Sequence, residues 1–219
     1  MGCSAEQRKP EPDDLGIYRS CNWSDERMVE VSAAIGAGCT WAPEATYDEK
    51  TGEYVVYWAS RTPSVDTKQR LYYVKTRDFY TFTEPKLYIE KDQSSIDTTM
   101  IEHNGTYYRF TKNEGGSTNS LGAKTKTIFL EKSDSVLGNF TQIASGSLNS
   151  NQYVEGPTIF KLNQDDTDGT DKWCLLVDDF GGGGYYPLVT TDLESGVFTK
   201  PEVVHTRCRA AQDMVHRSV

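Results

Sequence analysis

The sequence lacks an apolar run of the roughly 18 residues that a membrane-spanning helix needs, and its first residues lack the apolar stretch of a secretory signal. No membrane partner is therefore expected. The localisation is left undetermined, and an extracellular or periplasmic site would need an export signal encoded elsewhere in the parent gene. Residues 1–14 are rich in proline and charge and are expected to form a disordered lead-in.

Cysteine is scarce and scattered, with five residues in 219 and no CxxC pair or zinc-like spacing. A structural metal cage is therefore not expected. The odd count also argues against a fully paired disulfide framework, although a single bridge stays possible.

Positive charge is in deficit, because 23 Lys and Arg residues face 32 Asp and Glu residues, for a net charge of -9. Such a chain repels phosphate backbones and anionic lipid surfaces, which excludes nucleic acid as an expected partner and favours a neutral ligand. The same acidity is also what solubility alone would produce.

What the sequence does contain is a repeat. Four aromatic residues that follow polar turns, Trp23, Phe82, Phe140 and Phe198, are spaced about 58 residues apart. This period is near the 40 to 50 residues typical of propeller blades. With 18 Gly and 13 Tyr, the composition suits short strands joined by turns, and little helix is expected.

Each copy of the repeat contains β-rich runs separated by turns. The fold class is accordingly predicted to be all-β, a β-propeller of four-stranded antiparallel blades. The predicted inner strands contain 45–47, 99–101 and 158–160, the second strands 54–58, 107–110 and 173–177, and the third strands 71–74, 126–130 and 186–189.

Counted in blades, the chain is expected to form an incomplete propeller. Residues 41–90, 96–149 and 154–204 make three blades, and residues 15–31 make the outer half of an earlier one. The expected domain is thus an incomplete propeller over 15–219, and its open blade edges are expected to favour self-association.

Three carboxylates, Glu44, Asp97 and Glu155, stand at or within about a residue of equivalent places at the entrances of the inner strands. Inner strands of a propeller line its axis, so these acids are predicted to converge at one end of the channel. Several acids in one partly dry cavity should have separated pKa values, as glycoside hydrolysis requires. Alternatively, each acid caps a strand or pairs with Arg or Lys.

At these segments the chain resembles glycoside hydrolase family 43, the five-bladed propellers that act on arabinose-, xylose- and galactose-containing glycans. The resemblance runs from Leu15 to about Val204, so the chain would cover about three and a half blades. Three motifs carry it: residues 39–45 (CTWAPEA) resemble the WAP(D/E) motif, 95–97 (SID) the SID motif, and 154–157 (VEGP) the EGP motif.

The resemblance implies roles for individual residues. Glu155 would be the general acid, and Asp97 would orient Glu155 and raise its pKa. Members of the family invert configuration, and their general base is an Asp at the entrance to the first blade. Asp13 and Asp14 lie upstream of the half blade without the surrounding pattern, so neither is assigned as this base.

Substrate binding is assigned to Trp41, as an apolar wall against a sugar face, and to Glu44. Trp41 could instead be a core residue between blades. Asp178 and Asp179, before a glycine run, could border the cleft or belong to a plain hairpin. No cofactor is expected to be required. The resemblance leaves calcium possible near a histidine, with His205 and His216 as the candidates.

The predicted function is an α-L-arabinofuranosidase-like glycoside hydrolase with an oligosaccharide or polysaccharide substrate. A non-catalytic carbohydrate-binding propeller that lacks the base is the alternative. A sialidase-type propeller is weaker, because no arginine cluster stands at the inner strand entrances.

Overall fold

The computed structural model describes residues 28–115, 126–143, 148 and 153–201. The chain divides into two compact units, residues 1–30 and 31–219. All that follows concerns the second unit. The predicted lead-in, the half blade up to residue 27, His205 and His216 lie outside the described residues.

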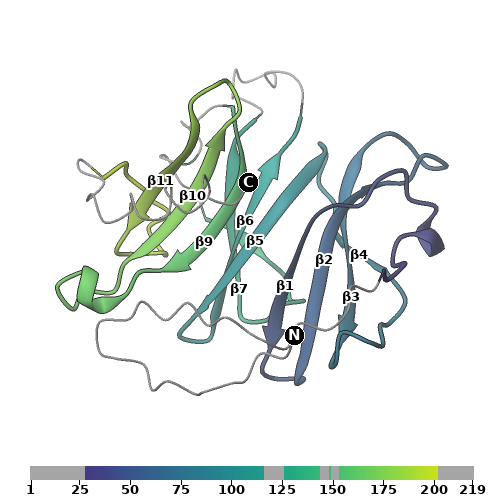
Figure 1. Ribbon diagram of the computed structural model, residues 1–219, viewed down its shortest axis with the longest axis horizontal. Helices are drawn as coiled ribbons and strands as arrows, with labels where there is room; N and C mark the ends of the chain where they lie inside the picture. The colour runs from purple at the N-terminus through teal and green to yellow at the C-terminus, as the bar shows by residue number, and fades with distance from the viewer. Residues whose placement is uncertain (1–27, 116–125, 144–147, 149–152, 202–219) are drawn as a thin grey trace, which may run out of the picture. The chain divides into compact units, whose positions relative to one another are not determined.

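Three antiparallel sheets follow one another along the chain (Figure 1). The first is formed by β1 (Trp41–Asp48), β2 (Glu53–Arg61), β3 (Gln69–Thr76) and β4 (Lys86–Ile89). The second is formed by β5 (Ser95–His103), β6 (Thr106–Asn113), β7 (Ile128–Ser133) and β8 (Thr141–Gln142). The third contains β9 (Val154–Lys161), β10 (Trp173–Asp179) and β11 (Gly184–Thr190).

Helix is nearly absent from the described part of the chain, where the helical elements with described bounds are two short 3-10 turns, η1 (Ala33–Ile35) and η3 (Gln164–Asp166). No helix there is long and apolar enough to pass through a bilayer. The all-β prediction is confirmed, and each predicted inner, second and third strand falls on a strand of the structure.

The turns between the strands follow from local sequence. Asn104 and Gly105 both adopt positive φ angles, 52° and 80°, between β5 and β6. Two consecutive residues with positive φ are the requirement of a type I′ hairpin, which Asn-Gly meets at low cost. In the longer turn between β1 and β2, Gly52 alone has a positive φ, 66°.

The third sheet departs from the predicted four strands. Among the described residues its outer edge is a single bridge between Val189 and Thr199, where the first two sheets have β4 and β8. Pro201 follows two residues later and has no N–H to donate, which opposes continuation of a ladder there.

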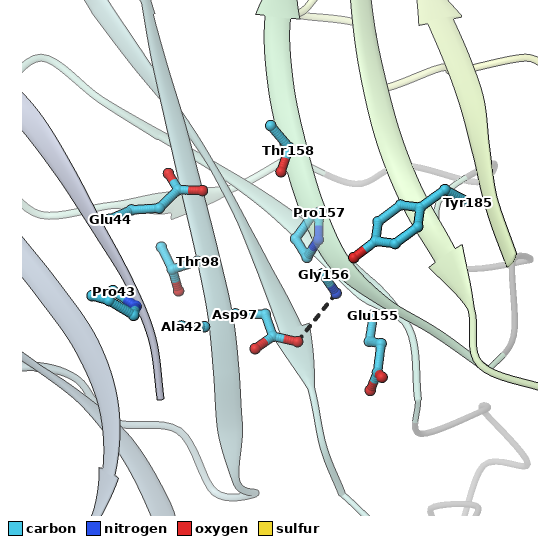
Figure 2. A pocket seen from close by; sticks show the side chains of 10 residues that line it. All are labelled: Ala42, Pro43, Glu44, Asp97, Thr98, Glu155, Gly156, Pro157, Thr158 and Tyr185. Carbon is cyan, nitrogen blue, oxygen red and sulfur yellow. Dashed lines mark hydrogen bonds between the residues drawn. The ribbon is translucent and has the colours of Figure 1, made fainter. Parts of the chain in front are cut away.

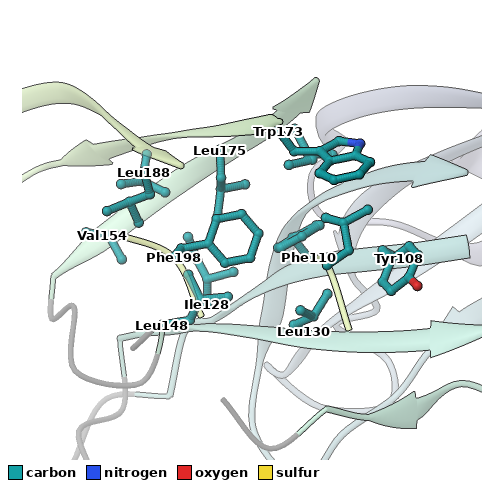
Figure 3. Close-up of a cluster of buried hydrophobic side chains, with 13 residues drawn as sticks. Tyr108, Phe110, Ile128, Leu130, Leu148, Val154, Trp173, Leu175, Leu188 and Phe198 are labelled. Atoms are coloured by element: carbon teal, nitrogen blue, oxygen red, sulfur yellow. The ribbon is translucent and has the colours of Figure 1, made fainter. Parts of the chain in front are cut away.

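The sheets are joined by apolar side chains rather than by strand pairing. Between the second and third sheets lies the largest buried cluster, which Figure 3 shows around Phe110, Leu130 and Leu175. A second cluster joins the first and second sheets through Val55, Tyr57 and Tyr107. β6 serves both, because its successive side chains alternate between the two neighbouring sheets.

Candidate active site

The inner strand β5 contacts both β1 and β9, and each of these three strands is irregular near its start. The pairing with the second strand shifts by one residue in each sheet, which is the mark of a β-bulge. One residue per bulge has a positive φ angle: Ala42 (46°), Asp97 (46°) and Gly156 (53°). These three residues are therefore equivalent positions of the repeat.

The bulges correct the predicted equivalence of the three carboxylates. Asp97 occupies the bulge position itself, Glu155 precedes the bulge residue by one, and Glu44 follows it by two. The three acidic side chains thus leave the backbone at three different positions along the inner strands, relative to the bulge. They nevertheless meet, because all three line one pocket of about 360 Å³.

Figure 2 shows how the carboxylates are distributed in this pocket. Asp97 lies centrally in that view, with Glu44 on the side of β1 and Glu155 on the side of β9. Asp97 Oδ2 accepts a hydrogen bond from the backbone N–H of Gly156, with 3.1 Å between the two atoms. This bond ties the second sheet to the residue that follows Glu155.

Burial sets the electrostatics of two of the acids. Desolvation raises the pKa of Glu44 from 4.5 to about 6, against hydrogen bonds from Thr99 and Tyr57. Desolvation also raises the pKa of Asp97, opposed by the Gly156 N–H and by the charge of Lys112. Both carboxyl groups therefore take up protons more readily than ordinary surface acids.

Glu155 has a different environment. Its Oε2 lies 2.6 Å from Nζ of Lys112, a side chain that is only 1% exposed, whereas the Glu155 side chain is 37% exposed. The pocket thus combines two desolvated carboxyl groups with one that is ion-paired.

Two further residues of the site were not singled out from the sequence. Tyr185 lines the pocket and comes from the strand after the glycine run (Figure 2). Its hydroxyl would lie 3.1 Å from a Cβ at position 156, so both the φ angle and this contact favour glycine there. Lys112 could have been suspected, because it shares the β6 face of Tyr108 and Phe110 and a charge on an apolar face needs a partner.

Other predicted residues are not among the side chains that line this pocket. Trp41 is 48% exposed within the described residues, and its ring does not line the pocket. Asp178 and Asp179 pair with Glu155 and Val154 in the β9–β10 ladder, and Asp179 accepts a hydrogen bond from the Gly181 N–H in the hairpin.

Metal binding finds no support in the part of the chain that the structure describes, where no three His, Cys, Asp or Glu side chains form a group suited to an ion. His205 and His216, the histidines named in the calcium prediction, lie outside that part. Cys39 and Cys174 take part in no disulfide bond.

The fold and the site together define a class, that of propeller glycoside hydrolases. Residues 12–217 match the family-43-related model described as "Probable glycosyl hydrolase domain", and the chain belongs to this family.

Three individual proteins are similar to this chain. An alpha-L-arabinofuranosidase from Bifidobacterium longum subsp. longum is 36% identical over 185 residues, which are 72% of this chain and 17% of that protein. The chain therefore spans about one-sixth of this curated relative. The α-L-arabinofuranosidase from Podospora anserina, solved with cellotriose, has a TM-score of 0.52 at 14% identity, over 76% of this chain and 51% of that one.

A GH43 enzyme from Xanthomonas citri, solved with xylotriose, has a TM-score of 0.53 at 10% identity, over 74% of this chain and 54% of that one. At these identities the structural likenesses bear on the fold alone. With the blade-like sheets, they confirm the predicted all-β propeller architecture.

Proposed function

We propose that this chain carries the acid side of an α-L-arabinofuranosidase-like active site that hydrolyses arabinose-containing glycans with inversion. The observation that supports it most directly is the convergence of Glu44, Asp97 and Glu155, from three sheets, on one pocket. The family and the arabinofuranosidase relative support the same chemistry. An oligosaccharide or polysaccharide end is the proposed substrate.

In the proposed reaction, Glu155 gives its proton to the glycosidic oxygen while the bond from that oxygen to the anomeric carbon breaks. Water attacks the anomeric carbon from the opposite face and loses its proton to a general base, which leaves a product of inverted configuration. Asp97 orients the Glu155 segment through the Gly156 N–H. Glu44 binds a sugar hydroxyl, and Trp41 is retained as a candidate sugar-facing ring. No residue is assigned as the base.

The acid role is tested by Glu155→Gln, with Glu84→Gln, an exposed glutamate, as the matched control. Removal of a general acid should lower kcat/KM on an arabino-oligosaccharide by about 10²- to 10⁴-fold. An aryl arabinofuranoside with a good leaving group needs little protonation, so its hydrolysis should suffer far less. Equal losses on both substrates would argue against the acid role.

Stereochemistry gives a second readout. Proton NMR of the first-formed sugar should show the anomer opposite to that of the substrate. Binding of arabino-oligosaccharide by the chain, without turnover of arabinofuranoside, xyloside or galactofuranoside substrates, would favour the carbohydrate-binding alternative instead.

A further inference from the structure

Lys112 is a charged side chain that the proposed reaction leaves without a role. It stands near the end of β6 and is 1% exposed, as deeply buried as the apolar residues around it. Removing an ammonium group from water is costly unless it is paired and hydrogen-bonded. A lysine buried beside a pocket is therefore expected to have carboxylate partners that offset this cost.

Two carboxylates share this lysine. Lys112 Nζ lies 2.6 Å from Glu155 Oε2 and 2.7 Å from Glu114 Oε2. Glu114 is in turn held by Lys126, whose Nζ lies 2.8 Å from Glu114 Oε1. The ring of Phe180 covers the Lys112 ammonium, with 4.6 Å from Nζ to the ring centroid. The charges alternate in sign from Lys126 to Glu155.

Other titratable groups also face Glu155. Asp97 from β5 interacts electrostatically with both Lys112 and Glu155. Asp178 of β10 is the ladder partner of Glu155, and Tyr185 of β11 and Glu44 of β1 line the same pocket. Apart from Lys126, which is held by Glu114, Lys112 is the cation that the described residues place in this group of acids.

We propose that Lys112 is a positioning residue for Glu155, which fixes the direction of its carboxyl group and strengthens it as a proton donor. This inference rests on the proposed function. When Glu155 takes a proton from solvent, the ammonium keeps its ion pair with Glu114. When the proton passes to the leaving oxygen, the negative charge that forms on Glu155 regains the ammonium of Lys112, so the ion pair favours the transfer.

The ion pair makes a difference that a titration can measure. An adjacent ammonium favours the charged form of a carboxyl group, so removal of the Lys112 charge should make the Glu155 carboxyl group easier to protonate. Glu114 moderates the effect, because it competes for the same ammonium.

The test uses the full chain with glutamate labelled at the carboxyl carbon, and the Glu155 signal is identified by its absence in Glu155→Gln. Lys112→Met keeps the length and burial of the side chain but removes its charge. The midpoint of the Glu155 titration should move up by about one to two pH units. Lys132→Met, which removes a surface charge paired with Glu194, should leave the midpoint unchanged.

Glu114→Gln provides a variant with the opposite expected sign. Once Glu114 is neutral, Lys112 no longer divides its charge between two carboxylates, so the Glu155 midpoint should move down. This variant keeps the lysine in place and carries the test even if Lys112→Met does not fold. An unchanged midpoint in Glu114→Gln and in a folded Lys112→Met would overturn the proposal.

Activity adds a separate readout. In Lys112→Met the basic limb of the kcat/KM profile should move to higher pH, with kcat on an unactivated oligosaccharide about tenfold lower. A lower kcat with an unmoved limb would mean a merely structural role and would overturn the proposal. A chain with no turnover at any pH would count against the proposed function, while the titrations would still decide the role of Lys112.

Discussion

At the scale of single residues, Glu44 shows what the pocket does to a carboxyl group. Its Oε2 lies 3.5 Å from the hydroxyl of Tyr57, and no cation is among the groups that shift its pKa. Burial therefore dominates and raises the pKa to about 6. The group stays neutral under mildly acidic conditions, in which it can donate as well as accept a hydrogen bond.

Glu44→Gln should consequently change the pH dependence of stability. The folded pKa of about 6 exceeds the ordinary 4.5, so the stabilising contribution is complete below pH 4.5 and is lost as pH rises through 6. At pH 8 the free energy of unfolding of Glu44→Gln should exceed that of the wild type by on the order of 1 kcal/mol. The shift in pKa alone would give more, but the carboxyl group faces the pocket, where solvent screens it.

Urea unfolding of both proteins at pH 4, 5, 6 and 8 measures this difference. It should grow between pH 4.5 and 6 and then level off. Glu84→Gln, at an exposed position, serves as the control and should show no such growth. A constant difference between Glu44→Gln and the wild type at all four pH values would contradict the raised pKa.

At the scale of elements, the three entrance bulges decide the geometry of the pocket. Two of the positive φ angles fall on Ala42 and Asp97, which have a Cβ and are strained in the left-handed region. The third falls on Gly156, which has no Cβ and adopts this conformation without strain. The same backbone feature is thus built from three different residue types.

Ala42→Gly should stabilise the protein. Relief of the left-handed strain, about 1–2 kcal/mol, exceeds the 0.5–1 kcal/mol entropic cost of glycine, for a net gain of about 0.5–1 kcal/mol. Ala45→Gly, in the regular part of the same strand, relieves no strain. It brings only the entropic cost of glycine and should destabilise the protein by about 0.5–1 kcal/mol. Thermal melts compare the two, and equal losses in both would show that the bulge is not strained.

The strands themselves could be predicted from sequence, because alternating β-branched and aromatic residues between turn signals determine them locally. The bulges could not. Neither Ala42 nor Asp97 is a residue that signals a positive φ, and the inner strands consequently begin several residues before the predicted runs. The offsets of the three carboxylates along the repeat depend on these bulges, which is why the predicted equivalence was only approximate.

The long-range contacts of the site were equally beyond the sequence. That Glu44, Asp97 and Glu155 share a pocket followed from the repeat, since equivalent strands of a propeller face one axis. The ion pair of Glu155 with Lys112 did not, because it depends on which face of β6 meets the third sheet. Tyr185 was likewise hidden, since the length of the glycine hairpin sets where β11 places its first side chains.

At the scale of the whole unit, a buried charge cluster joins the first two sheets. Arg109 Nη2 lies 2.7 Å from Glu131 Oε2, with side-chain exposures of 5% and 1%, and Lys91 also contacts Glu131. The Arg109 guanidinium stacks 3.7 Å from the centroid of Phe140 and 5.1 Å from that of Tyr88. Tyr88 belongs to the first sheet, so the cluster crosses between sheets.

Glu131→Gln should therefore be strongly destabilising. It leaves the Arg109 guanidinium buried without its counter-charge, at a cost of about 3–5 kcal/mol, or roughly 6–20 °C in the melting temperature. Asp171→Asn breaks an exposed pair with Lys161 and should cost at most about 1 kcal/mol. Calorimetry of both variants is the measurement, and a loss for Glu131→Gln no larger than for Asp171→Asn would contradict the account.

The pocket belongs to no single sheet, and this has a consequence for dynamics. Its walls come from three sheets that share no strand pairing, and the Asp97–Gly156 bond and the Lys112–Glu155 ion pair cross the boundary between the second and third. A transient separation of two sheets would abolish the pocket while every hairpin stayed intact. A bound sugar would select the docked members of the ensemble and slow amide hydrogen exchange along both boundaries, far beyond the residues it touches.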